Sequence, residues 1–157
     1  NQVNDIVVAY DGGIGIHDMI VHNYGPGRIR ISLHAEVPAD GDILEIHDMI
    51  DTIEHRLRYY LHCSAVIHMD PICVEDEVTA LLRKKVAGYL KDIDPSITMH
   101  DFRIVKGPTH TNVIFDIVVP YNFPIPDDKV VKTLSERIQS ENPNHFAVIE
   151  VDKQFVK

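Results

Sequence analysis

The chain has 157 residues, of which 45% are hydrophobic and 25% are charged, and its formal net charge is -9. This composition is typical of a folded globular chain and excludes an intrinsically disordered one. The negative charge disfavours nucleic acid as a partner, because a phosphate backbone would be repelled, and it favours small cations as ligands.

No stretch of the sequence approaches the roughly 20 uncharged apolar residues that a membrane-spanning helix requires. The sequence opens at Asn1 without an initiator Met, and apolar residues from Val3 to Tyr10 already follow helical spacing. We therefore expect a water-soluble fragment of a larger protein, with its first helix truncated. The two cysteines lack CxxC spacing, which argues against a disulfide framework and favours a reducing compartment.

The two halves of the sequence resemble each other. The segment AVIHMD at 65–70 returns as AVIEVD at 147–152, and IHDMIV at 16–21 returns as MHDFRI at 99–104. These matches lie 82 and 83 residues apart and in the same order, which is the signature of an internal repeat. The sequence therefore predicts two tandem copies of one small domain, at residues 1–72 and 73–157.

The first copy contains a predicted hairpin. Residues 25–27 read Gly-Pro-Gly, which suits a tight turn between strands at 14–24 and 27–37. The second of these strands alternates apolar and polar residues, so that one of its faces is expected to pack on the core.

A helix and a strand follow the hairpin. Asp42 and Glu45 resemble a capping box, and apolar residues from Ile43 to Leu61 then recur at helical spacing. A short strand at 65–70 closes the copy, and Pro71 is expected to end it.

The second copy follows the same order. Its expected elements are a helix, two strands, a helix and a strand, at residues 74–92, 97–106, 110–119, 127–142 and 146–152. The fold class predicted for the whole chain is α+β, with two tandem ferredoxin-like domains. Each domain is expected to hold a three-stranded, mostly antiparallel sheet with two helices on one face, the first helix of copy one being truncated.

Histidine is concentrated in the first copy, which holds seven of the ten in the chain. His68 and Asp70 lie two residues apart on a strand and so share a face. His34 is on the polar face of the second hairpin strand, His17 is on the first, and His47 lies beside the apolar stripe of the helix. The candidate metal ligands are therefore His17, His34, His47, His68 and Asp70.

Imidazole and carboxylate ligands without thiolate suit zinc, manganese, iron(II) or cobalt, and the number of histidines favours zinc. Two alternatives stay open for individual residues. His47 could instead be a core histidine bonded to the backbone. Surface positions are expected for His22, His55 and His62.

The second copy carries a different set at the equivalent positions. Lys129 takes the place of His47, and a protonated ammonium cannot bind a metal. The metal site is therefore predicted to be weak or lost in this copy, with a harder ion such as manganese or magnesium as the alternative. The five equivalent residues are His100, Asp116, Lys129, Glu150 and Asp152.

Four blocks, in the order HDMIVHNYGPGR, ISLHAEVP, ILEIHDMIDTIEHRL and VIHMDP, together resemble the cytoplasmic C-terminal domain of cation diffusion facilitator transporters. These are efflux proteins for zinc and related divalent metals, and the resemblance covers about residues 10–72. It implies a ferredoxin-like domain on the cytoplasmic side of the membrane that forms a homodimer and is attached to a membrane-spanning part of the same polypeptide. Residues 73–157 resemble the second, degenerate copy found in some longer bacterial members.

The resemblance also implies a binuclear metal site near the dimer interface. Its ligands would be His17, His34, His47, His68 and a bridging Asp70.

The resulting hypothesis is a regulatory metal sensor rather than an enzyme, with no catalytic residues. Two alternatives belong to other classes. Three His-Asp dipeptides, at 17, 47 and 100, suggest a metal-dependent phosphohydrolase as an alternative. Two of these dipeptides fall on predicted strands, which argues against this alternative. A purely structural dimerisation module is the third hypothesis, and it predicts no saturable metal binding.

Overall fold

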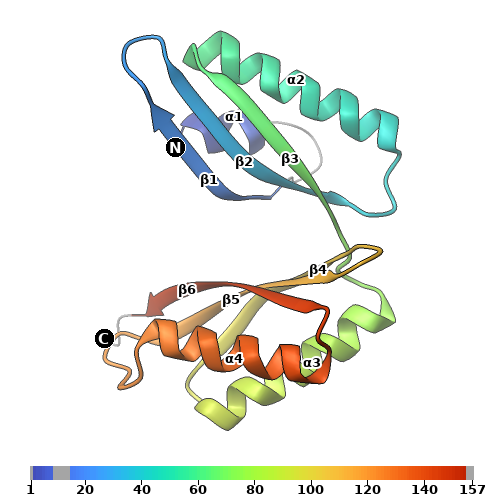
Figure 1. Ribbon diagram of the computed structural model, residues 1–157, viewed down its shortest axis with the longest axis vertical. Helices are drawn as coiled ribbons and strands as arrows, with labels where there is room; N and C mark the ends of the chain where they lie inside the picture. The colour runs from blue at the N-terminus through green and yellow to red at the C-terminus, as the bar shows by residue number, and fades with distance from the viewer. Residues whose placement is uncertain (1, 9–14, 155–157) are drawn as a thin grey trace. The chain divides into compact units, whose positions relative to one another are not determined.

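The computed structural model describes residues 2–8 and 15–154. The chain divides into two compact units, Asn1–Ile72 and Cys73–Lys157, each with the element order helix, strand, strand, helix, strand (Figure 1). Two of the sequence-based expectations, helical spacing as far as Tyr10 and a strand beginning at residue 14, fall in part outside the described residues.

The first unit consists of a three-stranded sheet and two helices. Strand β1 pairs antiparallel with β2, and β2 pairs parallel with β3, in the sheet order β1-β2-β3. The elements are α1 (Gln2–Val8), β1 (Ile16–Asn23), β2 (Ile29–Pro38), α2 (Ile43–Leu61) and β3 (Ser64–Ile72).

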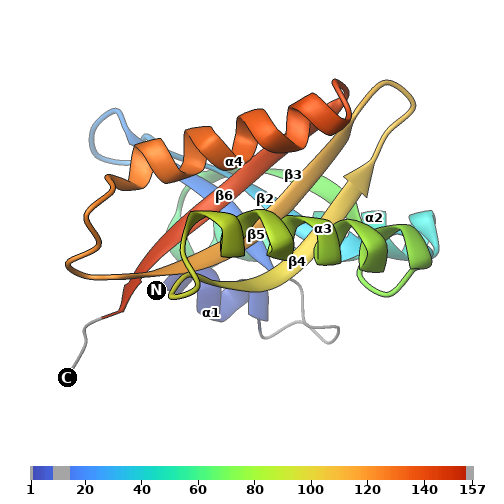
Figure 2. The same ribbon diagram turned by 90° about the horizontal axis from the view of Figure 1, so that it is seen from below.

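The second unit repeats this arrangement. Its sheet order is β4-β5-β6, again with one antiparallel and one parallel pair. Helices α3 and α4 lie side by side on one face of this sheet (Figures 1 and 2). The elements are α3 (Glu77–Ile93), β4 (Thr98–Lys106), β5 (Thr111–Pro120), α4 (Asp127–Glu141) and β6 (His145–Gln154).

The α+β, ferredoxin-like fold is confirmed, and the sheets are mixed rather than mostly antiparallel. The reason is the helix between the last two strands of each unit. A helical crossover returns the chain to the end at which the preceding strand began, so the next strand runs in the same direction.

The middle strand of each sheet builds the core. In β2 the side chains of Ile31, Leu33, Ala35 and Val37 are buried, while the residues between them are partly exposed. This alternation confirms the predicted period of two. In β5 the equivalent buried side chains lie 82 residues later, at Val113, Phe115, Ile117 and Val119.

Helix α2 begins where the sequence predicts. The Asp42 carboxylate accepts hydrogen bonds from the backbone N–H groups of Leu44 and Glu45, at 2.9 and 3.0 Å, and so caps the first turn. The predicted apolar stripe is buried at Ile50, Ile53 and Leu57, but its first member, Ile43, is 67% exposed. The stripe therefore meets the core only after the first turn of the helix.

Strand β3 does not end at Pro71, contrary to the prediction, and continues to Ile72. Within the described residues β3 is an edge strand, and proline is tolerated at an edge because its missing N–H breaks no ladder bond there. The Ile67 N–H donates to the Glu54 carboxylate of α2 at 3.1 Å. The edge is thus partly covered by a side chain of the neighbouring helix.

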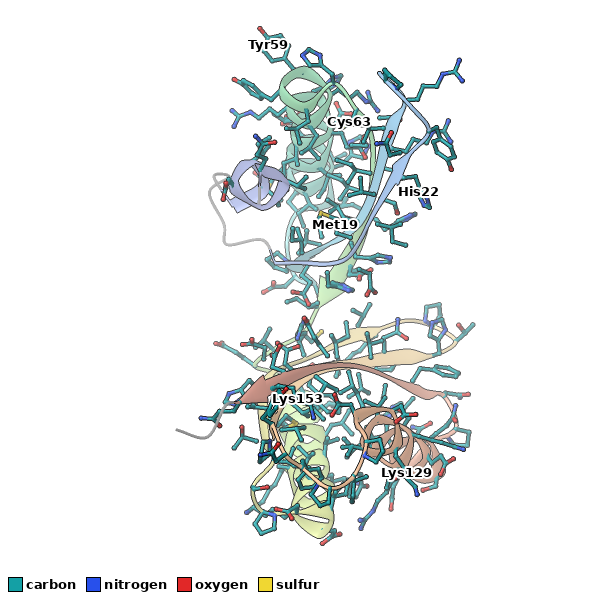
Figure 3. All side chains as sticks on the ribbon, turned by 90° about the vertical axis from the view of Figure 1, so that its left-hand side faces the viewer. Met19, His22, Tyr59, Cys63, Lys129 and Lys153 are labelled. Carbon is teal, nitrogen blue, oxygen red and sulfur yellow. The ribbon has the colours of Figure 1, made fainter. Side chains whose placement is uncertain are left out.

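A bulge interrupts the first strand of each sheet. The pairing of β1 with β2 shifts between His17 and Ile20, and Asp18 within it has φ 50°. Aspartate is among the few residues other than glycine that adopt this left-handed conformation readily. The extra residue shifts the alternation of side chains between the two faces of the sheet. Ile16 before the bulge and Met19 after it both pack against the core, whereas His22 points away from it (Figure 3). In β4 the same shift occurs around Asp101, which has φ 55°.

The core of the first unit should depend strongly on Leu57, which is fully buried. We expect Leu57→Ala to lower the free energy of unfolding of this unit by about 2–5 kcal/mol, because it removes apolar contacts and leaves a cavity. Chemical denaturation followed by circular dichroism measures the change. Tyr59→Ala, at a side chain that is 74% exposed in the same helix, is the matched control and should change it by less than about 0.5 kcal/mol. Equal effects of the two substitutions would contradict this description of the core.

Candidate metal centre

Three histidines form a row across the face of the first sheet that its own helices leave uncovered, the open face. His17 of β1 is the register partner of His34 in β2, and His34 is the register partner of His68 in β3. The ring centroids are 5.0 Å apart for His17 and His34 and 5.1 Å apart for His34 and His68. Residues from three different strands are thus brought to one place by strand pairing alone.

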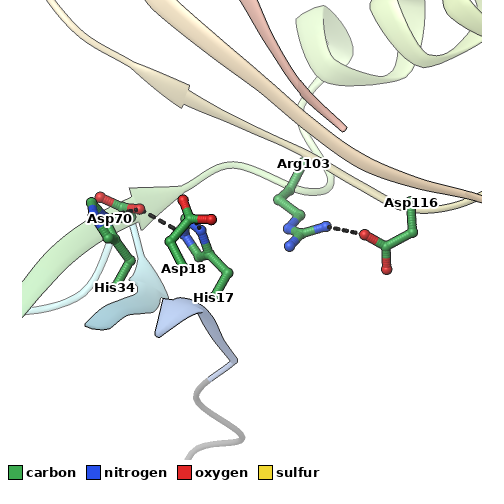
Figure 4. Close-up of polar contacts among 6 residues, drawn as sticks. All are labelled: His17, Asp18, His34, Asp70, Arg103 and Asp116. Atoms are coloured by element: carbon green, nitrogen blue, oxygen red, sulfur yellow. Dashed lines mark hydrogen bonds and ion pairs between the residues drawn. The ribbon is translucent and has the colours of Figure 1, made fainter. Parts of the chain in front are cut away.

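Asp70 lies beside this row and joins two of its members (Figure 4). Its Oδ2 atom is 2.8 Å from Nε2 of His17 and 3.1 Å from Nδ1 of His34. The exposed fractions of the three side chains are 14% for His17, 36% for His34 and 20% for Asp70, so the cluster is partly shielded from water.

One ligand atom from each of His17, His34 and Asp70 lies within 4.8 Å of the others. Two imidazoles and a carboxylate are a donor set that zinc and neighbouring divalent metals accept. His68 adjoins the cluster through His34 and could supply a fourth ligand. The residues present therefore fit a divalent metal.

Asp18 orients His17 from the opposite side of the imidazole. Its Oδ2 atom is 3.3 Å from Nδ1 of His17, while Nε2 of the same ring faces Asp70 (Figure 4). A carboxylate on the second ring nitrogen of a metal-binding histidine fixes the tautomer and the ring direction. This role was not predicted from the sequence, although the His17-Asp18 dipeptide was the available signal.

Glu36 is a second residue that sequence reasoning missed. It is the register partner of Asp70, it is partly buried, and it lies on the same face of β2 as His34. The signal was present in the alternation of β2, where Glu36 follows His34 by two residues. Glu36 adds negative charge next to the cluster.

His47 lies apart from the other four predicted ligands. It is on α2, on the side of the sheet opposite to the histidine row, and its side chain is exposed. It borders a pocket of about 190 Å³ together with Asp51, Glu54, Ile67 and Met69. The alternative of a core histidine does not fit this exposure.

The three histidines that were expected at the surface are all exposed. His22 stacks on Tyr24 with ring centroids 6.0 Å apart, and Nε2 of His55 is 3.4 Å from a carboxylate oxygen of Asp51. His62 is the C-cap residue of α2.

The second unit places a cation in the corresponding cluster. Arg103, which occupies the position of Ile20, lies 3.8 Å through Nη1 from Oδ1 of Asp116, the equivalent of His34 (Figure 4). The same Nη1 donates to the backbone oxygen of Asp101 in the bulge at 2.6 Å. His100, the equivalent of His17, is exposed and contacts Thr98 at 3.0 Å.

The surroundings of Asp116 disfavour the negatively charged form of its carboxyl group. Burial raises the pKa of this carboxyl most, and Glu150, Asp101 and Asp152 raise it further, whereas Arg103 lowers it. The cation among these acidic groups is therefore Arg103.

Lys129 was predicted to take the position of His47, and the packing of the two helices does not support this equivalence. The lysine is exposed on α4, and the buried residues of the two helices match at offsets of 80 or 81, as with Ile50 and Val130 or Leu57 and Ile138. These offsets align His47 with Asp127 or Asp128 instead.

The fold and the side-chain cluster define the first unit as an α+β domain with a candidate divalent-metal centre. Residues 1–72 match the family model described as cation efflux protein, cytoplasmic domain. This match confirms the resemblance found in the sequence. The family is one of transporter domains rather than of enzymes, which disfavours the phosphohydrolase hypothesis.

Two relatives illustrate the similarity. The cation-efflux pumps FieF of Yersinia pestis (strain Pestoides F) and of Yersinia pseudotuberculosis serotype O:3 (strain YPIII) are each 35% identical to this chain over 74 residues. The aligned segment covers 46% of this chain and only 24% of the length of each pump. Within the part of the chain that the structure describes, no helix combines the length and the apolar character needed to cross a membrane.

The Arg103 contact can be tested through its partner carboxyl. We expect Arg103→Gln to raise the pKa of Asp116 further, because it removes the one group that lowers this pKa. A carboxyl whose pKa is raised on folding binds more protons in the folded state, so stability falls as the pH rises through that pKa. The variant should therefore lose more stability than the wild type across the acidic range.

Carbon-detected NMR titration of the Asp116 carboxyl measures the pKa directly. Arg137→Gln is the control, because this arginine lies on α4 and pairs with Asp92 at 2.6 Å. An unchanged Asp116 pKa in the Arg103 variant would refute the assignment.

Proposed function

We propose that this chain is the metal-binding, dimer-forming cytoplasmic part of a divalent-cation efflux transporter, and that metal binding to its first unit regulates transport. The observation that carries the proposal is the row of His17, His34 and His68 with Asp70 beside it, in a domain of this family. Zinc is the metal that the imidazole-rich donor set favours, with manganese, iron(II) and cobalt as alternatives.

The residues of the first unit would have distinct roles in this centre. Asp70 is placed to act as a shared ligand, since one of its oxygens already contacts two imidazoles. Asp18 holds the His17 ring in position. A bound dication supplies positive charge that offsets the carboxylates gathered on and beside the open face.

His47 supports a dimeric arrangement. Because it lies on the helix side of the sheet, it would join a centre on the open face most readily from a second copy of the chain. The open face also carries Ile20 and Val66, which are 51% and 52% exposed and both pair with Ser32, two residues before His34. Apolar side chains exposed beside a candidate site suit an interface that a second copy would cover.

Regulation would follow from charge. Asp18, Glu36 and Asp70 lie close together, and the same groups of a second copy would repel them when the two approach. Neutralising this repulsion favours the closed pair and biases the attached membrane-spanning part, which we propose as the partner within the same polypeptide. A coupling of this kind typically amounts to about 1–3 kcal/mol.

The second unit would be a degenerate copy of the first, with the domain boundary between residues 72 and 73. Its open face carries Asp116 and Glu150 in place of His34 and His68, with Arg103 among the acidic groups. An internal guanidinium would compete with any added cation there, so we expect no zinc binding by this unit.

Zinc binding by the purified chain is the direct test. Isothermal titration should detect saturable binding, and His68→Ala/Asp70→Ala should weaken it by at least about a hundredfold, because two donors are lost. His22→Ala/His55→Ala removes two exposed histidines outside the row and should leave the affinity unchanged. Sedimentation velocity in the same samples should show dimer formation with zinc.

The pH dependence gives a second readout of this prediction. Metal and protons compete for the histidine nitrogens, so affinity should fall as the pH drops through about 6.5, the ordinary range of imidazole protonation. Wild-type affinity in the His68/Asp70 variant, or the same affinity at pH 8 and pH 5.5, would overturn the proposed centre.

The orienting role of Asp18 makes a separate prediction. Asp18→Asn retains a residue type that tolerates the left-handed bulge but loses the negative charge facing His17. Zinc affinity should fall by about 10- to 100-fold, as is usual when the carboxylate partner of a metal-binding histidine is lost. Asp101→Asn makes the same change in the bulge of the second unit and should have no effect on zinc binding. If both variants bind zinc like the wild type, Asp18 has no such role.

A further inference from the structure

The arginines of the first unit are gathered at one place. Residues 1–72 contain eleven Asp and Glu but only four arginines and no lysine. Three of these four arginines, Arg28, Arg30 and Arg58, line a single open pocket of about 750 Å³. A domain that is strongly acidic overall thus holds a local cluster of positive charge.

The pocket lies between the β1-β2 turn and the C-terminal end of α2. Tyr24 comes from the turn, His62 from the helix end and Ser64 from the start of β3. None of the described residues that line it is an aspartate or a glutamate. In the described part of the chain, no carboxylate pairs with Arg28 or Arg30, and Arg58 lies 3.8 Å from Glu54.

The pocket is far from the candidate metal centre. Arg30 is the register partner of Ser64, and Asp70 lies six residues further along the same strand. At the usual rise of a strand this separation is about 20 Å. The two ends of one sheet therefore present opposite charges, and the pocket does not depend on metal binding.

We propose that this pocket binds a phosphate group. Guanidinium groups present paired N–H donors that match phosphate oxygens, and Tyr24, Ser64 and His62 can add neutral donors. The C-terminal end of α2 opposes an anion with only about half an elementary charge, which three guanidinium groups outweigh.

Neighbouring aromatic residues extend the pocket. A second depression shares Arg58 and His62 with it and is also lined by Tyr59 and Tyr60. These tyrosines are 74% and 64% exposed, and Figure 3 shows Tyr59 at the C-terminal end of α2. Such a surface suits a phosphate carried on an organic group, whether a lipid headgroup or a small soluble phosphate compound.

The experiment titrates the metal-free chain with two kinds of probe. Pyrophosphate at constant ionic strength, followed by ¹H-¹⁵N NMR, tests the soluble source, with chloride as the reference anion. Co-sedimentation with phosphatidylcholine vesicles, with and without phosphatidic acid, tests the lipid source. We expect saturable shifts at the backbone amides of Arg28, Arg30 and Ser64, or binding only to vesicles that contain phosphatidic acid.

Arg28→Gln/Arg30→Gln should reduce this binding by at least about tenfold, because two charge-assisted contacts are lost. Both side chains are exposed, so the fold should survive the change, and the dispersion of the NMR spectrum verifies it. Arg56→Gln, at the one arginine of this unit outside the pocket, is the matched control and should have little effect.

Three results would overturn the proposal. The first is the absence of saturable binding to either probe, and the second is an equal loss in the Arg56 variant. The third is loss of self-association in the double variant without any phosphate binding, which would assign the pocket to an acidic surface of a second copy.

Discussion

The left-handed bulge at Asp18 decides which side chains of β1 reach the open face. A regular strand would place His17 and Met19 on the same side of the sheet, since both are odd-numbered. The shifted pairing instead lets His17 join the row with His34 while Met19 packs against the core. Both the hydrophobic core and the candidate metal centre therefore depend on one backbone conformation, and the aspartate that adopts it also contacts His17.

The second unit shows what the same backbone does with different side chains. Asp101 repeats the bulge, and the register around it is the same. Two of the three histidines in the row are replaced by carboxylates, and Arg103 takes the position of Ile20 beside them. The same fold thus carries a cluster that fits a bound metal cation in the first unit, and a cluster that already contains the Arg103 guanidinium in the second.

Much of this was predictable from the sequence, for physical reasons. A period of two placed His68 and Asp70 on one face, and the alternation of β2 identified both its core and His34. The bulge could not be predicted, because Met19, Ile20 and Val21 are all apolar and so do not show where the alternation shifts. Lys129 was misassigned because the offset between the helices is one or two residues shorter than that between the strands. The side of the sheet on which His47 lies depends on how α2 packs.

The edge of β3 limits how the first unit can associate. Glu54 already accepts the N–H of Ile67, and Pro71 has no N–H to offer. A strand added along this edge would find one donor engaged and another missing, which is how natural sheets resist uncontrolled lateral growth. Two copies of this unit would accordingly not pair through a ladder along β3, and a contact through the broad surfaces of the sheet would be fitted by side chains rather than by main-chain ladders.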